Sequence, residues 1–321
     1  MYVLASKGTY WRSAIVGLAK TGKRLLQIAR YHITLKSNKP FGNITREVYF
    51  CLIFAQNTNP MPRFKLTIEY DGSHYRGWQF QREVPTVMGK LMDAVKEVYK
   101  KTDYELYGSG RTDAGVHALA QVAHLDIDSA MPPYVALTRL NELLPASINI
   151  LNVEKVQPRF HARYSAIARS YVYHISKRKS AFGKDFTWWV KDSLDVKAMA
   201  DATVHFVGMK DFKSFGTSEK EEDSTLVKLE QLKIFEIDDS ILIHIVGSHF
   251  LWKMVRRIVG TLVEVGKGKL GDEDIDLFFR QYSDIPSKFT APPSGLYLER
   301  VYYPGDTIEE EPIWLMNIIS K

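Results

Sequence analysis

The order of apolar patterns between residues 64 and 302 restricts the fold of this chain more than any other feature. Alternation of apolar and polar residues predicts strands, and apolar residues at helical spacing predict helices. The first half of this region predicts the order β-α-β-β-α-β, and the second half repeats it. Two such units, ferredoxin-like or RRM-like, can lie side by side as one central antiparallel sheet with helices on one face. We therefore expect an α+β fold with a ligand cleft between its two halves.

Capping residues help to place the predicted elements. Thr86 is a residue type that caps helices, Pro132-Pro133 is typical of a first helical turn, and Gly266 is a suitable helix end. The predicted strands cover residues 64–70, 104–107, 120–127, 148–156, 169–176, 226–237, 241–246 and 296–302. The predicted helices follow residues 86 and 132 and cover residues 196–207, 250–266 and 272–282.

Residues 1–60 differ in composition from the rest of the chain. They contain nine Lys or Arg and one Glu, a net charge of +8, and the whole chain carries +6, so residues 61–321 sum to −2. The basic pI is therefore no evidence that the main body binds nucleic acid, unless positive charge is concentrated in one cleft. We expect an extension at 1–60, a first half at 61–165, a second half at 166–305 and a solvated acidic tail at 306–321.

Three interpretations of the extension are open. Few acidic residues among scattered Lys and Arg are typical of an organellar transit peptide. The segment can also be upstream of the true start, because Met61 stands directly before the first clear strand. The third is a weak helical stripe formed by Trp11, Ile15, Leu18, Leu25 and Ala29. We expect this extension to be poorly packed.

Composition excludes several classes of protein. No apolar run is long enough for a membrane-spanning helix. The single cysteine, Cys51, excludes an internal disulfide framework, and its isolation is compatible with a reducing compartment, so we expect a cytoplasmic location. No His, Cys or acidic residues have the spacing of metal ligands, so no metal is expected.

A glycine-rich segment, Gly108 to Ala118, separates two predicted strands. Its three glycines permit sharp backbone conformations, so it is expected to form a tight loop with Arg111 and Asp113 at the apex. Taken alone, the segment could also be an ordinary hairpin turn, in which Asp is common. It lacks the Lys-Ser/Thr ending of a nucleotide-binding P-loop.

This loop and several further motifs together resemble the tRNA pseudouridine synthase A family. The matching motifs follow the order of that family and span about residues 61–304. Besides the loop they are Ile68-Glu69-Tyr70-Asp71-Gly72, Gly77-Trp78-Gln79, Phe160-His161-Ala162-Arg163, Ala168-Arg169-Ser170-Tyr171-Val172-Tyr173, the run from Phe250 to Gly260, and Gly295-Leu296-Tyr297-Leu298.

The resemblance implies the pseudouridine synthase fold, with the active site in a basic cleft across a central sheet. It also implies isomerisation of uridines 38 to 40 in the tRNA anticodon stem-loop after base flipping, by a homodimer that binds RNA across both subunits. The reaction moves a bond from a ring nitrogen to a ring carbon without net redox change, so no cofactor is required in principle.

The reaction requires a nucleophile, and a positioned carboxylate can serve as one. The resemblance places the catalytic aspartate of the family at Asp113. Arg111 is expected to pair with Asp113 and to fill the helix gap left by an extruded base. Arg256 lies in an apolar helical run, and a buried arginine needs a partner, for which Asp113 is the candidate. Periodicity alone does not decide between Arg256 and Arg257.

Substrate contacts follow from the same resemblance. Tyr171 stands at the position of the active-site tyrosine, where it could stack on uracil and relay a proton; Tyr173 shares its face and could be mistaken for it. Leu296 and Leu298 resemble the apolar wall under the base, with Leu298 as the expected contact, although a core role explains both equally well.

Other basic residues are candidate contacts to RNA phosphates, although each alone is more often solvated surface. They are His161, Arg163, Arg169, Lys253 and Arg257, with Arg76 and Arg82 as further candidates. His117 and His124 are expected to be structural. Two other functions compete with the isomerase: a non-catalytic RNA-binding protein, which would stack bases on aromatic residues, and a carboxylate-based hydrolase, for which the loop lacks a second carboxylate.

Overall fold

The structure is a computed structural model, and it describes residues 11–21, 24–35, 44–50, 61–218 and 224–312. The chain divides into two compact units, Met1–Pro60 and Met61–Lys321. Cys51 and the end of the tail at 313–321 lie outside the described residues. Within the described ranges, no helix has the length and apolar character needed to cross a membrane.

The first unit contains an antiparallel sheet in the order β1-β2-β3, formed by β1 (Trp11–Thr21), β2 (Arg24–Leu35) and β3 (Ile44–Phe50). The expected helical stripe is therefore wrong. Its residues lie on both sides of the connection between the paired Thr21 and Arg24. Two residues, one of them a glycine, separate that pair in the sequence, which is typical of a hairpin. A helical period that continues from one strand of an antiparallel pair into the other has no structural meaning.

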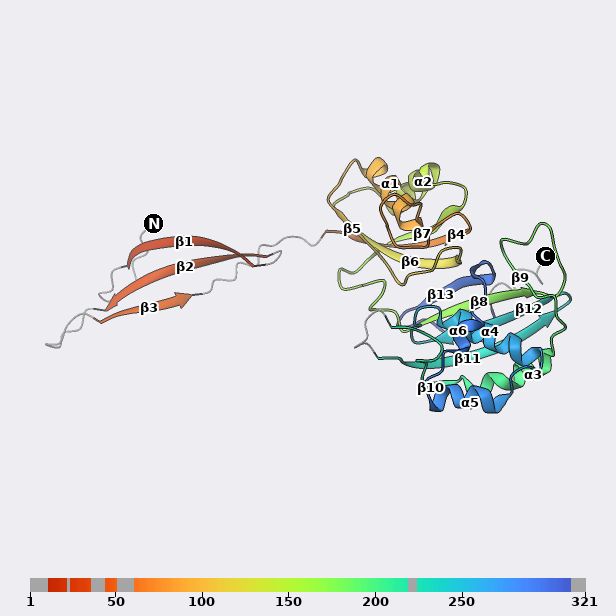
Figure 1. The fold of residues 1–321 in the computed structure, drawn as a ribbon. Helices are drawn as coiled ribbons and strands as arrows, with labels where there is room; N and C mark the ends of the chain where they lie inside the picture. The colour runs from red at the N-terminus through yellow and green to blue at the C-terminus, as the bar shows by residue number, and fades with distance from the viewer. Residues whose placement is uncertain (1–10, 22–23, 36–43, 51–60, 219–223, 313–321) are drawn as a thin grey trace. The chain divides into compact units, whose positions relative to one another are not determined.

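The second unit is built on one ten-stranded sheet, counted over the described residues (Figure 1). The strand order is β10-β11-β12-β8-β13-β6-β4-β7, with β5 paired to β6 and β9 paired to β8. The strands are β4 (Arg63–Tyr70), β5 (Tyr104–Gly108), β6 (His117–Ile127), β7 (Ile148–Val156), β8 (Ala168–Ser176), β9 (Trp188–Trp189), β10 (Gly208–Asp211), β11 (Leu226–Ile237), β12 (Ser240–Gly247) and β13 (Leu296–Tyr302).

Six α-helices are described in this unit: α1 (Val87–Tyr99), α2 (Pro133–Leu143), α3 (Val196–Asp201), α4 (Met254–Gly266), α5 (Asp272–Arg280) and α6 (Ile285–Lys288). Short 3-10 turns span Ala202–His205 and Pro293–Gly295. Thr86 caps α1 as predicted, because its side chain accepts a hydrogen bond from Gly89 N. The segment predicted as one helix at 196–207 is shorter, since α3 continues only as the first of these turns.

The sheet is mixed, which corrects the expectation of a purely antiparallel sheet. β13 pairs with β8 in antiparallel but with β6 in parallel, and β9 is parallel to β8. Alternation along a strand carries no information about its direction. β13 is reached by a long connection through α4, α5 and α6, and a long crossover is compatible with a parallel partner. The resulting fold is α+β.

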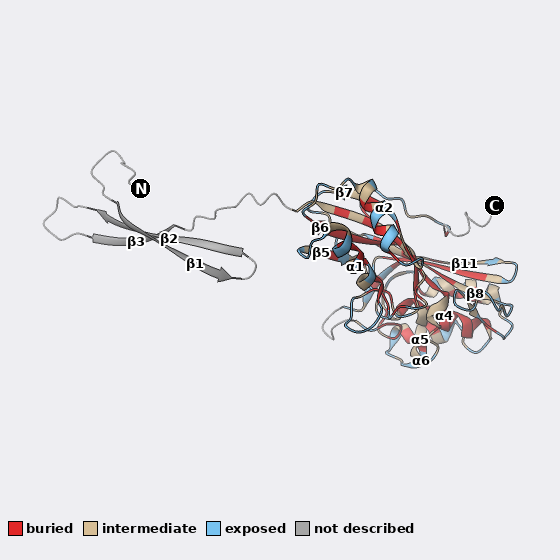
Figure 2. Ribbon diagram, turned by 90° about the horizontal axis from the view of Figure 1, so that it is seen from above, coloured by how far each residue is buried: buried red, intermediate tan, exposed pale blue. Residues whose placement is uncertain are grey.

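Helices and sheet bury two large apolar clusters, and Figure 2 shows that the buried residues follow the strands and the helix faces turned toward them. In the first, α1 contributes Val87, Leu91 and Val95 against β4 and β6. In the second, α4 contributes Ile258 and Leu262, both fully buried. Each side chain of this size contributes about 1.5–3 kcal/mol when removed from water. The seam between the clusters is where the candidate site lies.

The predicted helix at 250–266 begins four residues late, at Met254. Lys253 adopts a left-handed backbone conformation with φ 61°, and Trp252 forms an antiparallel bridge with Thr217. Residues 250–253 therefore lie across a neighbouring segment instead of starting the helix. Their apolar side chains fit the helical period only by coincidence.

The described part of the tail contacts the sheet through Ile308, while Glu310 and Glu311 are exposed, as expected of a solvated acidic segment. Ile308 contacts a small cluster formed by Ala168, Val246 and Tyr302. Glu309 pairs with Arg300 at 3.5 Å and Glu310 with Lys233 at 3.1 Å. Exposed ion pairs of this kind contribute little to stability, so Ile308 is the more important anchor.

Candidate active site

The glycine-rich loop leaves the sheet where two strands that pair with the same edge of β6 separate. β4 pairs along one edge of β6, so the two other partners of β6 share its opposite edge. β13 pairs there with His117 and Ala118, and β5 pairs from Ala123 to Ile127. Residues 109–116 connect β5 to β6 at the point where these two partners separate. The loop is thereby carried to the seam between the two halves of the unit.

Buried polar groups hold the start of the loop. Ser109 N donates to Val122 O at 2.7 Å, and the Ser109 hydroxyl donates to Gln121 Oε1 at 2.6 Å. The fully buried Gln121 also donates from Nε2 to Gly110 O at 3.2 Å. A buried amide satisfied in this way fixes both the loop backbone and its own rotamer.

Thr112 is held on both its side chain and its backbone. Its hydroxyl lies 2.7 Å from the Tyr70 hydroxyl, and its carbonyl accepts from Trp78 N at 3.1 Å. Gly77 has φ +91°, and a Cβ at this position would lie 2.5 Å from Thr112 O. A glycine is therefore required beside the loop, both for its backbone conformation and for space.

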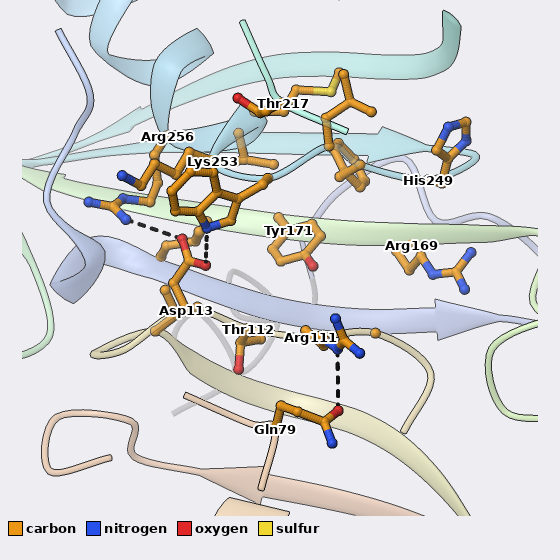
Figure 3. Close-up of a pocket in the computed structure, with 18 of the residues that line it drawn as sticks. Gln79, Arg111, Thr112, Asp113, Arg169, Tyr171, Thr217, His249, Lys253 and Arg256 are labelled. Carbon is orange, nitrogen blue, oxygen red and sulfur yellow. Dashed lines mark hydrogen bonds and ion pairs between the residues drawn. The ribbon is translucent and has the colours of Figure 1, made fainter. Parts of the chain in front are cut away.

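Both carboxylate oxygens of Asp113 accept hydrogen bonds from the other half of the unit (Figure 3). Arg256 Nη1 lies 3.3 Å from Oδ2, and Trp252 Nε1 donates to Oδ1 at 3.0 Å. Arg256 is fixed in turn, because its Nε donates to Ala291 O at 2.6 Å. The Asp113 side chain is 27% exposed, which leaves it open to a ligand. The arginine that reaches Asp113 is thus Arg256 and not Arg257.

Trp252 had no place in the prediction. The run from Phe250 to Lys253 fits the first turn of a helix, so no signal in the sequence placed the indole next to the aspartate. The bridge between Trp252 and Thr217 sets its position: Trp252 N donates to Thr217 O at 3.0 Å, and Thr217 N donates to Trp252 O at 3.3 Å. Lys253 Nζ lies 4.1 Å from the centre of the indole ring.

Arg111 lines the same cavity, where its Nε donates to Gln79 Oε1 at 3.3 Å (Figure 3). The expected ion pair with Asp113 is therefore supplied by Arg256, and the guanidinium of Arg111 extends along the cavity wall toward Gln79.

Tyr171 and Tyr173 have clearly different surroundings. Tyr171 lines the cavity and packs edge-on against Phe250, with ring centres 5.0 Å apart. Burial raises the pKa of the Tyr171 hydroxyl to about 12, with Arg169 opposing and Asp113 adding to the shift. Tyr173 is fully buried in the core, and its hydroxyl donates to Pro292 O at 2.8 Å.

Leu296 and Leu298 differ as well. Leu296 lines the cavity, whereas Leu298 is 1% exposed, lies in the first core cluster and is absent from the lining. The expectation that Leu298 lies at the site is therefore wrong, and Leu296 is the one of the two that lines the cavity. The two leucines share a face of β13, but only the first reaches the seam.

The cavity has a volume of about 1100 Å³. Among the described residues its lining contains one carboxylate, that of Asp113, and six Lys or Arg side chains: Arg76, Arg111, Arg163, Arg169, Lys253 and Arg256. Among the described lining residues, charge is thus mostly positive, although residues 61–321 are negative overall. Arg82, His161 and Arg257 do not line the cavity.

Arg169 forms hydrogen bonds with three loops at the cavity wall. Its guanidinium donates to the carbonyls of Ser109 at 3.1 Å, Arg163 at 2.9 Å and Ser248 at 3.0 Å. Burial lowers the pKa of Arg169. Because it links the glycine-rich loop to segments of both halves, its first role is to position the walls of the site.

The histidines are held by backbone hydrogen bonds. Nδ1 of His117 accepts from Gly72 N at 3.1 Å, and Nδ1 of His124 accepts from Ala162 N at 3.1 Å, in agreement with structural roles. Nδ1 of His161 accepts from Arg163 N at 3.1 Å. Burial, with a smaller effect of Arg63, lowers the pKa of His161, so at neutral pH it is not a cation for phosphate.

Within the described ranges, no group of three or more His, Cys, Asp or Glu side chains could hold a metal ion.

Comparison with known proteins connects this site to a family. The model of a family described as "tRNA pseudouridine synthase" matches residues 66–165 and 202–304. The chain is 42% identical over 246 residues to tRNA pseudouridine synthase A of Rhodopseudomonas palustris, covering 76% of this chain and 100% of that protein. It is 39% identical over 255 residues to tRNA pseudouridine synthase A 1 of Protochlamydia amoebophila, covering 76% and 97%.

A third relative is tRNA pseudouridine synthase A of Bartonella tribocorum, with 39% identity over 248 residues, which cover 76% of this chain and 100% of that protein. Among solved structures, a chain of a Cbf5-Nop10-Gar1 complex matches 62% of this chain and 54% of its own length with a TM-score of 0.27 and 10% identity, too weak a likeness to support any argument. The family model covers more than half of the chain, and the relatives are matched over nearly their whole length. The chain therefore belongs to the tRNA pseudouridine synthase A family, whose members are isomerases.

Proposed function

We propose that this protein isomerises uridines 38 to 40 in the anticodon stem-loop of tRNA to pseudouridine, with Asp113 as the nucleophile. The observation that supports this assignment best is the environment of Asp113. Its two oxygens are held by Trp252 and Arg256, in a cavity whose described lining otherwise carries only positive charge. A fixed carboxylate surrounded by cations can act as a nucleophile and recruit a phosphate backbone at the same time.

The proposed reaction conserves all atoms of the substrate. After attack by Asp113, the bond from the ribose carbon to the ring nitrogen breaks, and the uracil turns within the cavity. A bond then forms from the same ribose carbon to a ring carbon. That ring carbon loses its proton, the ring nitrogen gains one, and the carboxylate is released unchanged.

Tyr171 is proposed to hold the uracil and to relay the proton. Its ring forms a wall of the cavity, with Leu296 as a second apolar contact. Because the pKa of the Tyr171 hydroxyl is about 12, the phenol is protonated at neutral pH. It can accept the proton from carbon only while it passes on its own, so a concerted relay is the chemistry that this residue supports.

Arg111 is proposed to occupy the gap in the RNA helix after the uridine has been flipped out, a step that costs about a few kcal/mol. Arg163 and Lys253 are proposed phosphate contacts, and Arg169 is proposed to add its positive charge while it positions the cavity wall.

We also propose a homodimer that binds tRNA across both subunits, and a cytoplasmic location. Both proposals rest on the resemblance of this chain to its family.

The test of this function is the substitution Asp113→Asn, assayed by nucleoside analysis of an anticodon-arm RNA. We expect pseudouridine to fall below detection while RNA binding stays within about twofold of the unmodified protein, because the amide keeps the size of the side chain but is no nucleophile. The control is Asp128→Asn, whose side chain is 82% exposed beside Lys101. Pseudouridine formation by Asp113→Asn would refute the nucleophile, and binding without product by the unmodified protein would favour a non-catalytic RNA-binding protein.

A further inference from the structure

We infer that Tyr107, His161 and Tyr164 form a stacking surface for an unpaired RNA base that neighbours the target uridine. These three residues are called the aromatic patch below. The inference rests on the proposed function, since it assumes an RNA substrate in the adjacent cavity. It adds a second binding subsite that lies outside the lining of that cavity.

The rings of the aromatic patch are contiguous. The centre of His161 lies 4.4 Å from that of Tyr164 and 5.2 Å from that of Tyr107. The buried His124 lies beneath them, 4.6 Å from His161. Tyr164 is 76% exposed and Tyr107 is 49% exposed. Exposed aromatic residues are ordinary when they are scattered, but a connected group of them indicates a binding surface.

The patch carries no net charge at neutral pH. Arg63 lies nearby, but its guanidinium forms a bidentate ion pair with Asp126. Burial and the proximity of Arg63 lower the pKa of His124 to about 4 and also lower that of His161. The patch therefore offers π faces rather than cations, which suits a base and not a phosphate.

The patch adjoins the cavity through the chain itself. Tyr107 directly precedes Gly108, the residue that leads into the glycine-rich loop. His161 Nδ1 accepts from the backbone of Arg163, whose side chain lines the cavity. A strand of RNA that leaves the cavity past Arg163 would meet neutral aromatic rings next. This alternation of cation and aromatic ring is the composition expected of a surface for single-stranded nucleic acid.

Tyr164→Ala tests the subsite, because this ring is the most exposed of the three. The probe is an anticodon stem-loop with the fluorescent base 2-aminopurine at unpaired positions next to the target uridine. We expect about tenfold weaker binding, loss of the quenching caused by stacking, and a rise in KM that exceeds any fall in kcat. Tyr164→Phe keeps the ring and is expected to restore all three values.

The matched control is Tyr134→Ala, because Tyr134 is 73% exposed but lies on α2, outside the patch. It is expected to bind and quench like the unmodified protein. Binding by Tyr164→Ala within twofold of the unmodified protein would overturn the inference. A changed oligomeric state with unchanged RNA binding would also overturn it, and would make the patch a protein interface. Neither result affects the proposed function, which is tested separately by pseudouridine formation in the unmodified protein and in Asp113→Asn.

Discussion

The two walls of the cavity hold their functional side chains in different ways. On the first wall, most of the hydrogen bonds that fix the loop carrying Asp113 come from the same half, among them those of Gln121 and Tyr70. On the second wall, Trp252 and Arg256 reach Asp113 across 139 and 143 residues of sequence. The position of the nucleophile is therefore set mainly within its own half of the unit. Its hydrogen-bond and charge partners depend on how the two halves meet.

This difference has a consequence for how the site can fail. Damage to the first wall displaces the aspartate itself. Damage to the second wall leaves the aspartate in place and removes the groups that orient and balance it. The variants below separate these two kinds of failure.

The largest effect is expected at the charge partner. Arg256→Lys keeps a positive charge but cannot donate to Asp113 and Ala291 O in the same geometry, since an ammonium lacks the planar fork. We expect kcat to fall about 10²- to 10³-fold, measured by nucleoside analysis under single-turnover conditions. Arg257→Lys is the matched control one residue away and should keep kcat within about twofold. Equal losses in both variants would show that α4 as a whole, and not the ion pair, is responsible.

Each wall has a glycine at a position where a larger side chain does not fit, Gly260 in the second wall and Gly77 beside the first. Substitution of these glycines is expected to have the next largest effect. A Cβ on Gly260 would lie 1.5 Å from Phe289 O, so Gly260→Ala must separate α4 from the segment that contains Ala291. We expect the free energy of unfolding to fall by about 1–3 kcal/mol. Urea denaturation measures this change. Gly271→Ala is the control, because nothing lies within 4 Å of a Cβ there.

Gly77 lies beside the first wall and has φ +91°. The free energy of unfolding is therefore also expected to fall in Gly77→Ala. The two variants should nevertheless differ in the surviving enzyme. Gly77→Ala displaces the aspartate and should lower kcat even where the protein is fully folded, whereas a folded fraction of Gly260→Ala with normal kcat would show that the second wall tolerates movement. Full activity of folded Gly77→Ala would contradict the local control of the nucleophile.

The sequence was sufficient wherever a structural signal is local. The strands at 148–156, 226–237 and 296–302 were predicted with their observed limits, because runs rich in apolar and β-branched residues between turn residues are a local signal. The glycines of the loop are also a local signal, since they permit its sharp backbone, but the role of Asp113 was expected only from the resemblance to the family. Local patterns thus account for the first wall.

Long-range contacts account for what could not be predicted. The direction of β13 depends on a crossover, and the position of Trp252 depends on its bridge to the distant Thr217. Leu296 and Leu298 are equivalent by alternation and are separated only by where the seam crosses β13. In the first unit, no strand pairing was predicted either, and the residues of the expected helical stripe are divided between two paired strands. The second wall of the cavity is therefore the part that the sequence alone leaves open.

The smallest effect is expected at the residue that was hardest to predict. Trp252→Phe removes the N–H that donates to Asp113 Oδ1 but keeps an aromatic ring beneath Lys253. A hydrogen bond to a charged group is worth about 1.5–3 kcal/mol, and solvent at this exposed position replaces part of it, so we expect kcat/KM to fall about tenfold. Trp189→Phe is the matched control, since Trp189 is 40% exposed and also lies beneath a lysine, Lys179. If Trp252 only shapes the entrance, KM alone should rise in Trp252→Phe; if it orients the carboxylate, kcat should fall with KM unchanged. An unchanged kcat would mean that the hydrogen bond from Trp252 does not contribute to catalysis. The ion pair with Arg256 would then be the contact of the second wall that orients Asp113.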